Sequence, residues 1–259
     1  GKPKTEVEVL QIPDLASYKN EKDCEAYLDI SDFDEEEVKK ILAAFAKKKR
    51  GGTAPEDRCP RQKFPPGKFE GWKNIKSGTG SLFLFLFISL DGKTNLQSRL
   101  GEAAYKTVKT RLRDYLRQSL AEADALLWME SETNNLYLIP PKAANARAAV
   151  EAALKFLLAG PLVTIEFLGL SIPVHFTAAL HYGKTVYRAP GKTGTVVSDA
   201  VNYIFHLGAK HAESGRLTIS ADVPPEAVGE GLEDLFSDAG VFEGIPIRHS
   251  AKWTYASDV

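Results

Sequence analysis

The stretch from Leu82 to Leu90, LFLFLFISL, constrains the fold of this chain more than any other part of the sequence. Every residue in it is apolar except Ser89, and the turn sequence Asp-Gly-Lys-Thr follows at once. The run is far too short to cross a bilayer as a helix, which takes about 20 residues. A short run that is apolar on both faces is typical of a strand at the centre of a covered sheet.

The elements after this strand alternate between helical and strand periodicity. Residues 95–121 carry apolar side chains at helical spacing and predict a long helix. The next elements are a hairpin of Leu126–Glu130 and Leu136–Ile139, a helix near 142–158, strands at 162–167 and 172–182, a helix from Asp199 to about His211, a strand at 216–220 and closing strand sequence at 245–256. The order β-α-β-β-α-β, with C-terminal strand extensions, predicts an α+β, ferredoxin-like palm with its helices on one face of the sheet.

The composition changes near residue 80, where we expect a boundary. Residues 1–80 are an N-terminal extension or linker with a short strand at Val7–Ile12, a helix at 34–52 and a Pro- and Gly-rich segment after it. Residues 81–259 are expected to form the main domain.

The overall composition excludes several classes of function. The formal net charge is -1 and neither end is a long single-sign tail, so nucleic acid is not an expected partner. The sequence shows no signal peptide and no membrane segment. The chain has two cysteines, Cys24 and Cys59, which indicate neither a disulfide framework nor a cysteine zinc site and favour a reducing cytoplasm.

Two further patterns are weak signals of chemistry. Gly-Lys-Thr occurs three times, but a P-loop needs a glycine five positions earlier, where Phe87, Ala178 and Val186 stand. His175 and His181 fall on one face of a predicted strand about 20 Å apart, too far to share a metal ion. We therefore interpret the triplets as turns and the histidines as ordinary strand residues.

The helix that begins at Asp199 is more informative. Its sequence places Val201, Ile204, Phe205 and Gly208 toward the core and Asp199, Asn202, His206 and Lys210 on a polar stripe. Asn202 and His206 could together face one anionic ligand. A solvated amphipathic face is the alternative interpretation.

Read together, VHFTAALHYGKTV, VVSDAVNYIFHLGAKHAESGRLTIS and EGIPIRHSAKWTYA resemble the class III nucleotidyl cyclase catalytic domain of adenylate and guanylate cyclases. The resemblance covers about residues 80–256. The residues that match the motifs of that family are Asp199, Val201, Asn202 and Leu207 on the helix, Gly215, Leu217, Ile219 and Ser220 on the strand after it, and Phe87, Leu90, Gly92 and Thr94 around the first strand.

The resemblance also indicates where the family's functional residues would lie. The two metal-binding carboxylates align with Ser89 and Asn134, so no metal is expected there, although Asp91 and Glu132 could replace them if the strand ends are shifted. The purine-selecting Lys aligns with Glu130 and its Asp or Thr partner with Thr195. The transition-state Asn is kept as Asn202, and the transition-state Arg aligns with His206.

Three hypotheses of function follow from these positions. The first is a catalytically degenerate cyclase-like domain, not an enzyme and without a cofactor, that acts as a signalling, regulatory or dimerisation module. Family domains form head-to-tail dimers, so the resemblance implies a homodimer or a heterodimer with another cyclase-like domain. The second is a divergent adenylate or guanylate cyclase that acts on ATP or GTP with Mg or Mn held by Asp91 and Glu132. The third is a non-catalytic purine-nucleotide sensor that uses Thr195, Asn202 and His206.

Overall fold

The computed structural model describes residues 63–90, 93–131, 134–171, 173–193, 198–229 and 231–253. They contain a seven-stranded sheet in the order β2-β3-β1-β4-β5-β7-β6. The strands are β1 (Gly80–Leu90), β2 (Leu126–Glu130), β3 (Asn134–Ile139), β4 (Phe176–Val186), β5 (Leu217–Ser220), β6 (Phe236–Phe242) and β7 (Ile245–Ser250). Only the pair of β4 and β5 is parallel among these strands. The prediction that Leu82–Leu90 lies in a central strand is confirmed, because β1 pairs with β3 on one side and β4 on the other.

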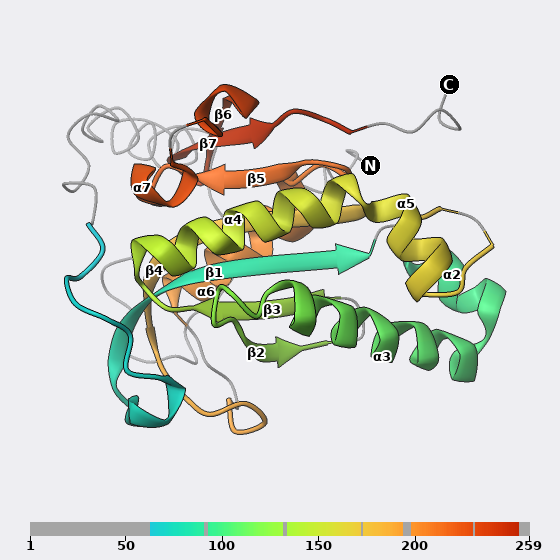
Figure 1. The fold of residues 1–259 in the computed structure, drawn as a ribbon, viewed down its shortest axis with the longest axis horizontal. Helices are drawn as coiled ribbons and strands as arrows, with labels where there is room; N and C mark the ends of the chain where they lie inside the picture. Colours follow the sequence, from blue (N-terminus) through green and yellow to red (C-terminus); the bar gives the residue numbers. More distant parts are fainter. Residues whose placement is uncertain are drawn as a thin grey trace, which may run out of the picture. The chain divides into compact units, whose positions relative to one another are not determined.

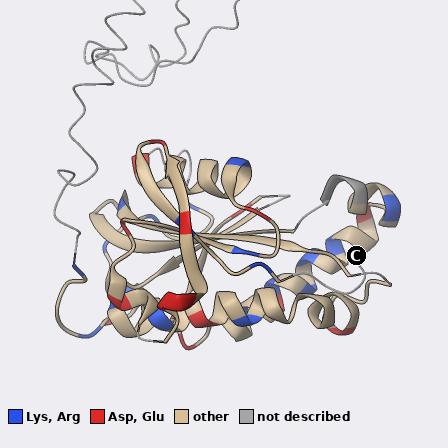
Figure 2. Cartoon of the chain, turned by 90° about the horizontal axis from the view of Figure 1, so that it is seen from above, with Lys and Arg blue, Asp and Glu red and all other residues tan. Residues whose placement is uncertain are grey.

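The helical segments cover both faces of this sheet. They are α2 (Lys93–Leu100), α3 (Glu102–Ser119), α4 (Ala143–Leu158), α5 (Gly160–Leu162), α6 (Asp199–His206) and α7 (Pro225–Val228), with 3-10 turns η3 (Trp72–Asn74) and η6 (Glu233–Leu235) and π turns η4 (Val163–Phe167) and η5 (Leu207–His211). In Figure 1, α3 and α4 lie in front of the sheet and α6 lies behind it. The view from above in Figure 2 shows helices on both sides of the strands.

The alternation of side chains along β1 explains this two-sided cover. Leu84, Leu86 and Ile88 belong to a buried cluster with the apolar faces of α3 and α4. Phe83, Phe85 and Phe87 belong to a second cluster with α6. Because successive residues of a strand point to opposite faces, a strand that is apolar throughout needs apolar partners on both. The expectation of helices on one face was wrong for this reason.

Gly208, in the π turn η5 that follows α6, packs closely against the ring of Phe87 in β1. A Cβ atom added there would lie 2.6 Å from Phe87 Cγ and closer still to two other ring atoms. The lack of a side chain at residue 208 therefore lets the end of the helix rest directly on the aromatic ring of the central strand.

Part of the predicted N-terminal extension packs on the same body as the sheet. The indole of Trp72 stacks on Phe83 and Tyr187, with ring centroids 5.9 and 6.1 Å away. Its Nε1 donates a hydrogen bond to the backbone oxygen of Asp124 at 2.8 Å. The strand predicted at 7–12 and the helix predicted at 34–52 lie outside the described residues, and the boundary near residue 80 stays a prediction.

Three local predictions differ from the structure. Residues 162–167 were predicted as a strand, but Gly160–Phe167 is helical and continues α4 after a bend of 68°. The β-branched residues suggested a strand, whereas Pro161 favours a helix start. The long helix at 95–121 is divided at Gly101, whose φ is 77°. β6 was not predicted, because FSDAGVF is too polar and Gly-containing to show an alternating apolar pattern.

No single helix among the described residues has both the length and the apolar character needed to cross a membrane. The bent pair Ala143–Leu158 and Gly160–Phe167 reaches that length and composition only when both parts are taken together.

Candidate functional site

Ser89 and Asn134, the two positions that the sequence resemblance aligns with metal carboxylates, lie directly opposite each other in the sheet. Ser89, near the end of β1, pairs in register with Asn134 at the start of β3 and with Thr177 of β4 on its other side. Ser89 is only 8% exposed. By alternation from Phe87, it belongs to the face of the sheet that α6 covers. The fold therefore brings a hydroxyl and a carboxamide together at these two positions.

Neutral oxygens of this kind make a poor site for divalent cations. Mg²⁺ in proteins is usually bound through one or two carboxylates and the phosphates of the substrate. Among the described residues there is no group of three or more His, Cys, Asp or Glu side chains that could hold a metal ion. Asp91, Glu132 and Thr195 lie outside the described residues, so their roles stay predictions.

The other predicted site residues lie on α6. Ser198 caps this helix, because its Oγ accepts a hydrogen bond from the backbone N–H of Val201 at 3.2 Å. Val201 is buried against the sheet, whereas Asn202 is exposed and His206 half-exposed one turn later. The predicted division of α6 into a core face and a polar stripe is confirmed.

His206 already has an anionic partner within the chain. Its Nδ1 lies 2.8 Å from Oε1 of Glu243. Glu243 stands in the turn between β6 and β7, with a positive φ of 46°. The side chain that aligns with the transition-state Arg of the family is thus engaged by a carboxylate where a substrate phosphate would be the expected partner.

Glu130, at the end of β2, is likewise engaged by an opposite charge. Arg113 of α3 places its guanidinium NH1 3.5 Å from Glu130 Oε2. A carboxylate accepts hydrogen bonds, whereas the Lys of the family donates them, so Glu130 would present a purine with a different hydrogen-bonding group. Glu130 also acts on its neighbour Tyr137, because burial first and then this carboxylate raise the pKa of the phenol.

A buried polar cluster beneath α6 was missed by the sequence reasoning. His181 of β4 lies within 2.9 Å of Ser220 Oγ through its Nδ1, and its ring is 4.4 Å from that of Tyr203 on α6. Burial lowers the pKa of His181 from 6.5 to about 3, so the imidazole is neutral. His175 directly precedes β4. The signal that could have found the cluster is the polar pair Ser220 and Asp222 after a predicted strand.

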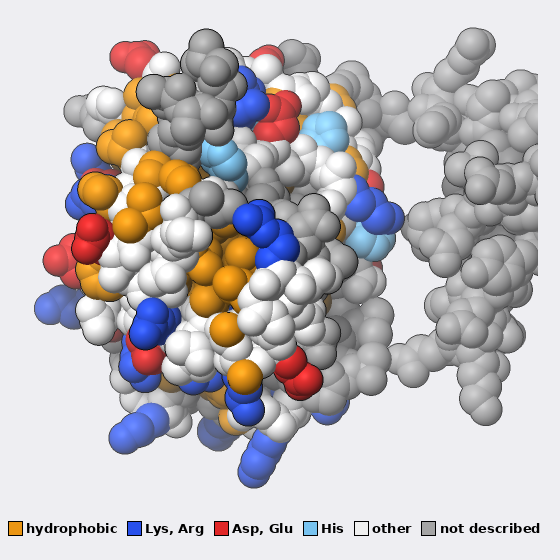
Figure 3. Space-filling model, turned by 90° about the vertical axis from the view of Figure 1, so that its right-hand side faces the viewer, with side chains coloured by type: hydrophobic (Ala, Val, Ile, Leu, Met, Phe, Trp, Pro, Cys, Tyr) orange, Lys and Arg blue, Asp and Glu red, His pale blue; other side chains and the backbone are white. Residues whose placement is uncertain are grey.

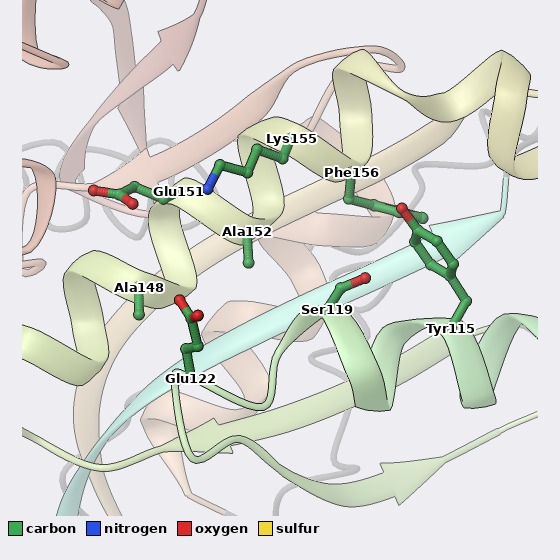
Figure 4. Close-up of a pocket in the computed structure, with 8 residues that line it drawn as sticks. All are labelled: Tyr115, Ser119, Glu122, Ala148, Glu151, Ala152, Lys155 and Phe156. Atoms are coloured by element: carbon green, nitrogen blue, oxygen red, sulfur yellow. The ribbon is translucent and has the colours of Figure 1, made fainter.

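A separate hollow lies on the opposite face of the sheet from α6. It has a volume of about 200 Å³ and opens between α3 and α4, as Figure 4 shows. Its lining consists of Tyr115, Ser119, Glu122, Ala148, Glu151, Ala152, Lys155 and Phe156. None of these residues aligns with a functional position of the cyclase family, so this hollow is distinct from the candidate site.

Comparisons with known proteins agree on the fold. No family model and no curated protein matches the sequence. The guanylyl cyclase Cya2 is similar in structure with a TM-score of 0.56 and 18% identity, over 71% of this chain and 98% of that one. The guanylate cyclase domain of RhGC from Catenaria anguillulae, in complex with GTP, gives 0.54 and 13% identity over 68% of this chain and 100% of that one.

The adenylyl cyclase CyaB from P. aeruginosa is a further similar structure, with a TM-score of 0.51 and 14% identity over 68% of this chain and 97% of that one. Identities this low show the fold alone. The chain has the fold of the class III adenylyl and guanylyl cyclase catalytic domains.

Proposed function

We propose that this chain is a catalytically degenerate cyclase-homology domain that acts as a regulatory or dimerisation module. The observation that supports the proposal is the pairing of Ser89 with Asn134 across β1 and β3, because the sequence resemblance aligns both positions with the metal-binding carboxylates of the family. The family reaction joins the ribose 3'-hydroxyl to the α-phosphate, and divalent cations activate that oxygen and neutralise the developing charge. Ser89 and Asn134 supply no negative charge to hold such cations.

The contact between His206 and Glu243 supports the same conclusion. A group that stabilises the transition state must be available to the phosphate, and a histidine that is hydrogen-bonded to a carboxylate of its own chain has to leave that partner first. A half-exposed pair of this kind contributes about 0–1 kcal/mol, so the contact weakens phosphate binding without preventing it.

The partner in this proposal is a second cyclase-like domain, either another copy of this chain or a different one. The resemblance implies head-to-tail dimers with composite sites, and a homodimer would carry Ser89 and Asn134 in both sites. Sedimentation equilibrium of the purified chain tests the homodimer. A monomer at all concentrations would leave the heterodimer as the form of the proposal to examine. We place the chain in the cytoplasm because its cysteines indicate a reducing compartment.

The decisive experiment is a cyclase assay of the purified chain with ATP and with GTP in the presence of Mn²⁺, with cyclic nucleotide measured by mass spectrometry. We expect no product. Mn²⁺ binding, followed by electron paramagnetic resonance, should be weak in the wild type and stronger in the double variant Ser89→Asp, Asn134→Asp. The neutral variant Ser89→Asn is the matched control and should not gain Mn²⁺ binding.

Product from the wild type would overturn the proposal. If that product disappeared in Asp91→Ala and in Glu132→Ala, the chain would be a divergent cyclase that uses these two carboxylates with Mg or Mn. If neither variant affected the rate, the relocated carboxylates would be excluded as well.

A second candidate function is a purine-nucleotide sensor, which the shared exposed face of Asn202 and His206 favours. Thr195 would contact the purine in this hypothesis. Isothermal titration calorimetry with ATP, GTP and the cyclic nucleotides should detect binding, and Glu243→Gln should strengthen it by releasing His206. Absence of heat in both the wild type and Glu243→Gln would remove this candidate.

A further inference from the structure

Four large apolar side chains are exposed within ten residues of one another at the end of α4 and in the helical segment after it. They are Leu158, Leu162, Ile165 and Phe167, here called the apolar stripe, and they are 58%, 65%, 44% and 53% exposed. Single exposed apolar residues are common on protein surfaces, but a contiguous group marks a contact surface. The stripe belongs to none of the positions that align with the cyclase site.

The geometry of the bent helix explains why these residues share a surface. Leu158 ends α4, whereas Leu162 and Ile165 lie three residues apart after the 68° bend and share one side of that helical segment. Phe167 lies nearer α3, where its ring centroid is 4.8 Å from that of Tyr115. The stripe therefore extends from α4 to the flank of α3.

The helices α2 and α3 carry more basic than acidic residues, although Arg113 and Arg117 are paired with Glu130 and Asp114. The segment of the stripe itself contains one acid, the exposed Glu166. The stretch Leu96–Ser119, which covers most of α2 and all of α3, has six basic and two acidic residues in a chain whose formal net charge is -1. Arg111 connects this basic stretch to the stripe, because its guanidinium donates a hydrogen bond to the backbone oxygen of Leu168 at 3.2 Å. Figure 3 looks onto this end of the molecule and shows hydrophobic side chains gathered in its upper left part with Lys and Arg below them.

We propose that this end of the domain binds the surface of an anionic phospholipid membrane. Exposed Leu, Ile and Phe side chains would enter the boundary between headgroups and acyl chains, and the basic stretch would lie against the lipid phosphates. The bent pair of helices reaches the length and apolar composition of a membrane span only across a 68° break, and a short apolar helical segment can lie in the plane of the interface. Charge complementarity thus selects an anionic surface.

A second copy of this chain fits the same surface less well. A symmetric contact would place the same patch of both copies face to face. The two basic stretches would then meet, and like charges across an interface oppose association.

The test is cosedimentation of the full chain with vesicles of phosphatidylcholine, with and without phosphatidylserine. We expect binding only to vesicles that contain phosphatidylserine, and less of it as salt is raised. Leu158→Asp should weaken binding by about tenfold or more, because one inserted apolar side chain is lost. Val241→Asp, on β6, is the matched control, since Val241 is also 58% exposed and the variant adds the same charge.

A second pair of variants tests the charge. Lys106→Glu, within the basic stretch, should weaken binding, whereas Lys184→Glu on β4 should leave it unchanged. All four variants change exposed side chains, and thermal unfolding should confirm that they remain folded. No binding of the wild type, or equal effects of Leu158→Asp and Val241→Asp, would overturn the proposal. Self-association in solution that Leu158→Asp abolishes would assign the stripe to a second copy and overturn it as well.

Discussion

The buried imidazole of His181 should make the stability of this domain fall as the solution becomes acidic. Burial lowers its pKa from 6.5 to about 3 in the folded state, while the unfolded chain keeps the ordinary value. The unfolded state therefore binds a proton that the folded state does not accept between these two pKa values. The contribution of the neutral His181 to the free energy of unfolding is fully present above about pH 6.5 and is lost progressively as the pH falls toward 3.

The size of the effect follows from the difference between the two pKa values. One pKa unit corresponds to about 1.4 kcal/mol, so the free energy of unfolding should fall by about 2 kcal/mol between about pH 7 and pH 5. Asp222 Oδ2 lies 3.9 Å from His181 Nδ1 and would favour the protonated form. This carboxylate is half exposed and screened by water, so it does not offset the burial of the imidazole. Burial also lowers the pKa of His249, which adds to the effect in the same direction.

Urea unfolding at a series of pH values measures this dependence directly. The variant His181→Asn keeps a polar atom near Ser220 but cannot take up a proton, so its stability should fall much less between pH 7 and pH 5. Equal slopes for His181→Asn and the wild type would refute the reasoning.

Two further substitutions test the packing of α6 on the sheet. Gly208→Ala should destabilise the fold by about 2 kcal/mol, because the overlap of the new methyl group with the ring of Phe87 costs more than the gain in helix propensity. Gly80→Ala is the control: its methyl group would meet only the flexible end of Lys184, so this variant should be nearly neutral in the same urea titration. Ser198→Ala should cost about 1 kcal/mol by removing the helix cap, and loss of helical circular dichroism at lower urea concentration would show it.

The periodicity of apolar residues predicts an element correctly where its sequence pattern is compatible with only one type of structure. β1 is apolar on both faces and must be central, and α6 has a polar stripe that can only face water. The segment 162–167 shows the limit, because Val, Thr and Ile favour a strand locally while the continuation of α4 holds them in helical form. Only the tertiary structure determines which of these preferences prevails.

The candidate site shows the same contrast between what a sequence pattern predicts and what only the folded structure shows. Ser89 and Asn134 could be singled out from the sequence through the family motif, but their direct pairing joins β1 to β3 and is seen only in the structure. The partners of the other site residues could not be predicted either. Glu243 is 37 residues from His206, and Arg113 reaches Glu130 from a different helix, so neither contact leaves a local pattern in the sequence.

The likeness to the cyclase family lies mostly in residues that pack. Of the residues that match its motifs, Phe87, Val201, Leu207, Leu217 and Ile219 are buried, and they hold α6 and β5 on the sheet. By the sequence resemblance, the positions that would touch nucleotide or metal mostly carry residues other than those of the family. Selection for a packed core acts on these buried residues whether or not the domain catalyses a reaction, since each buried contact contributes to stability. A domain that had lost its chemistry but kept a partner would retain this pattern, whereas an active enzyme would need new charged groups beside Ser89 to replace those it lacks.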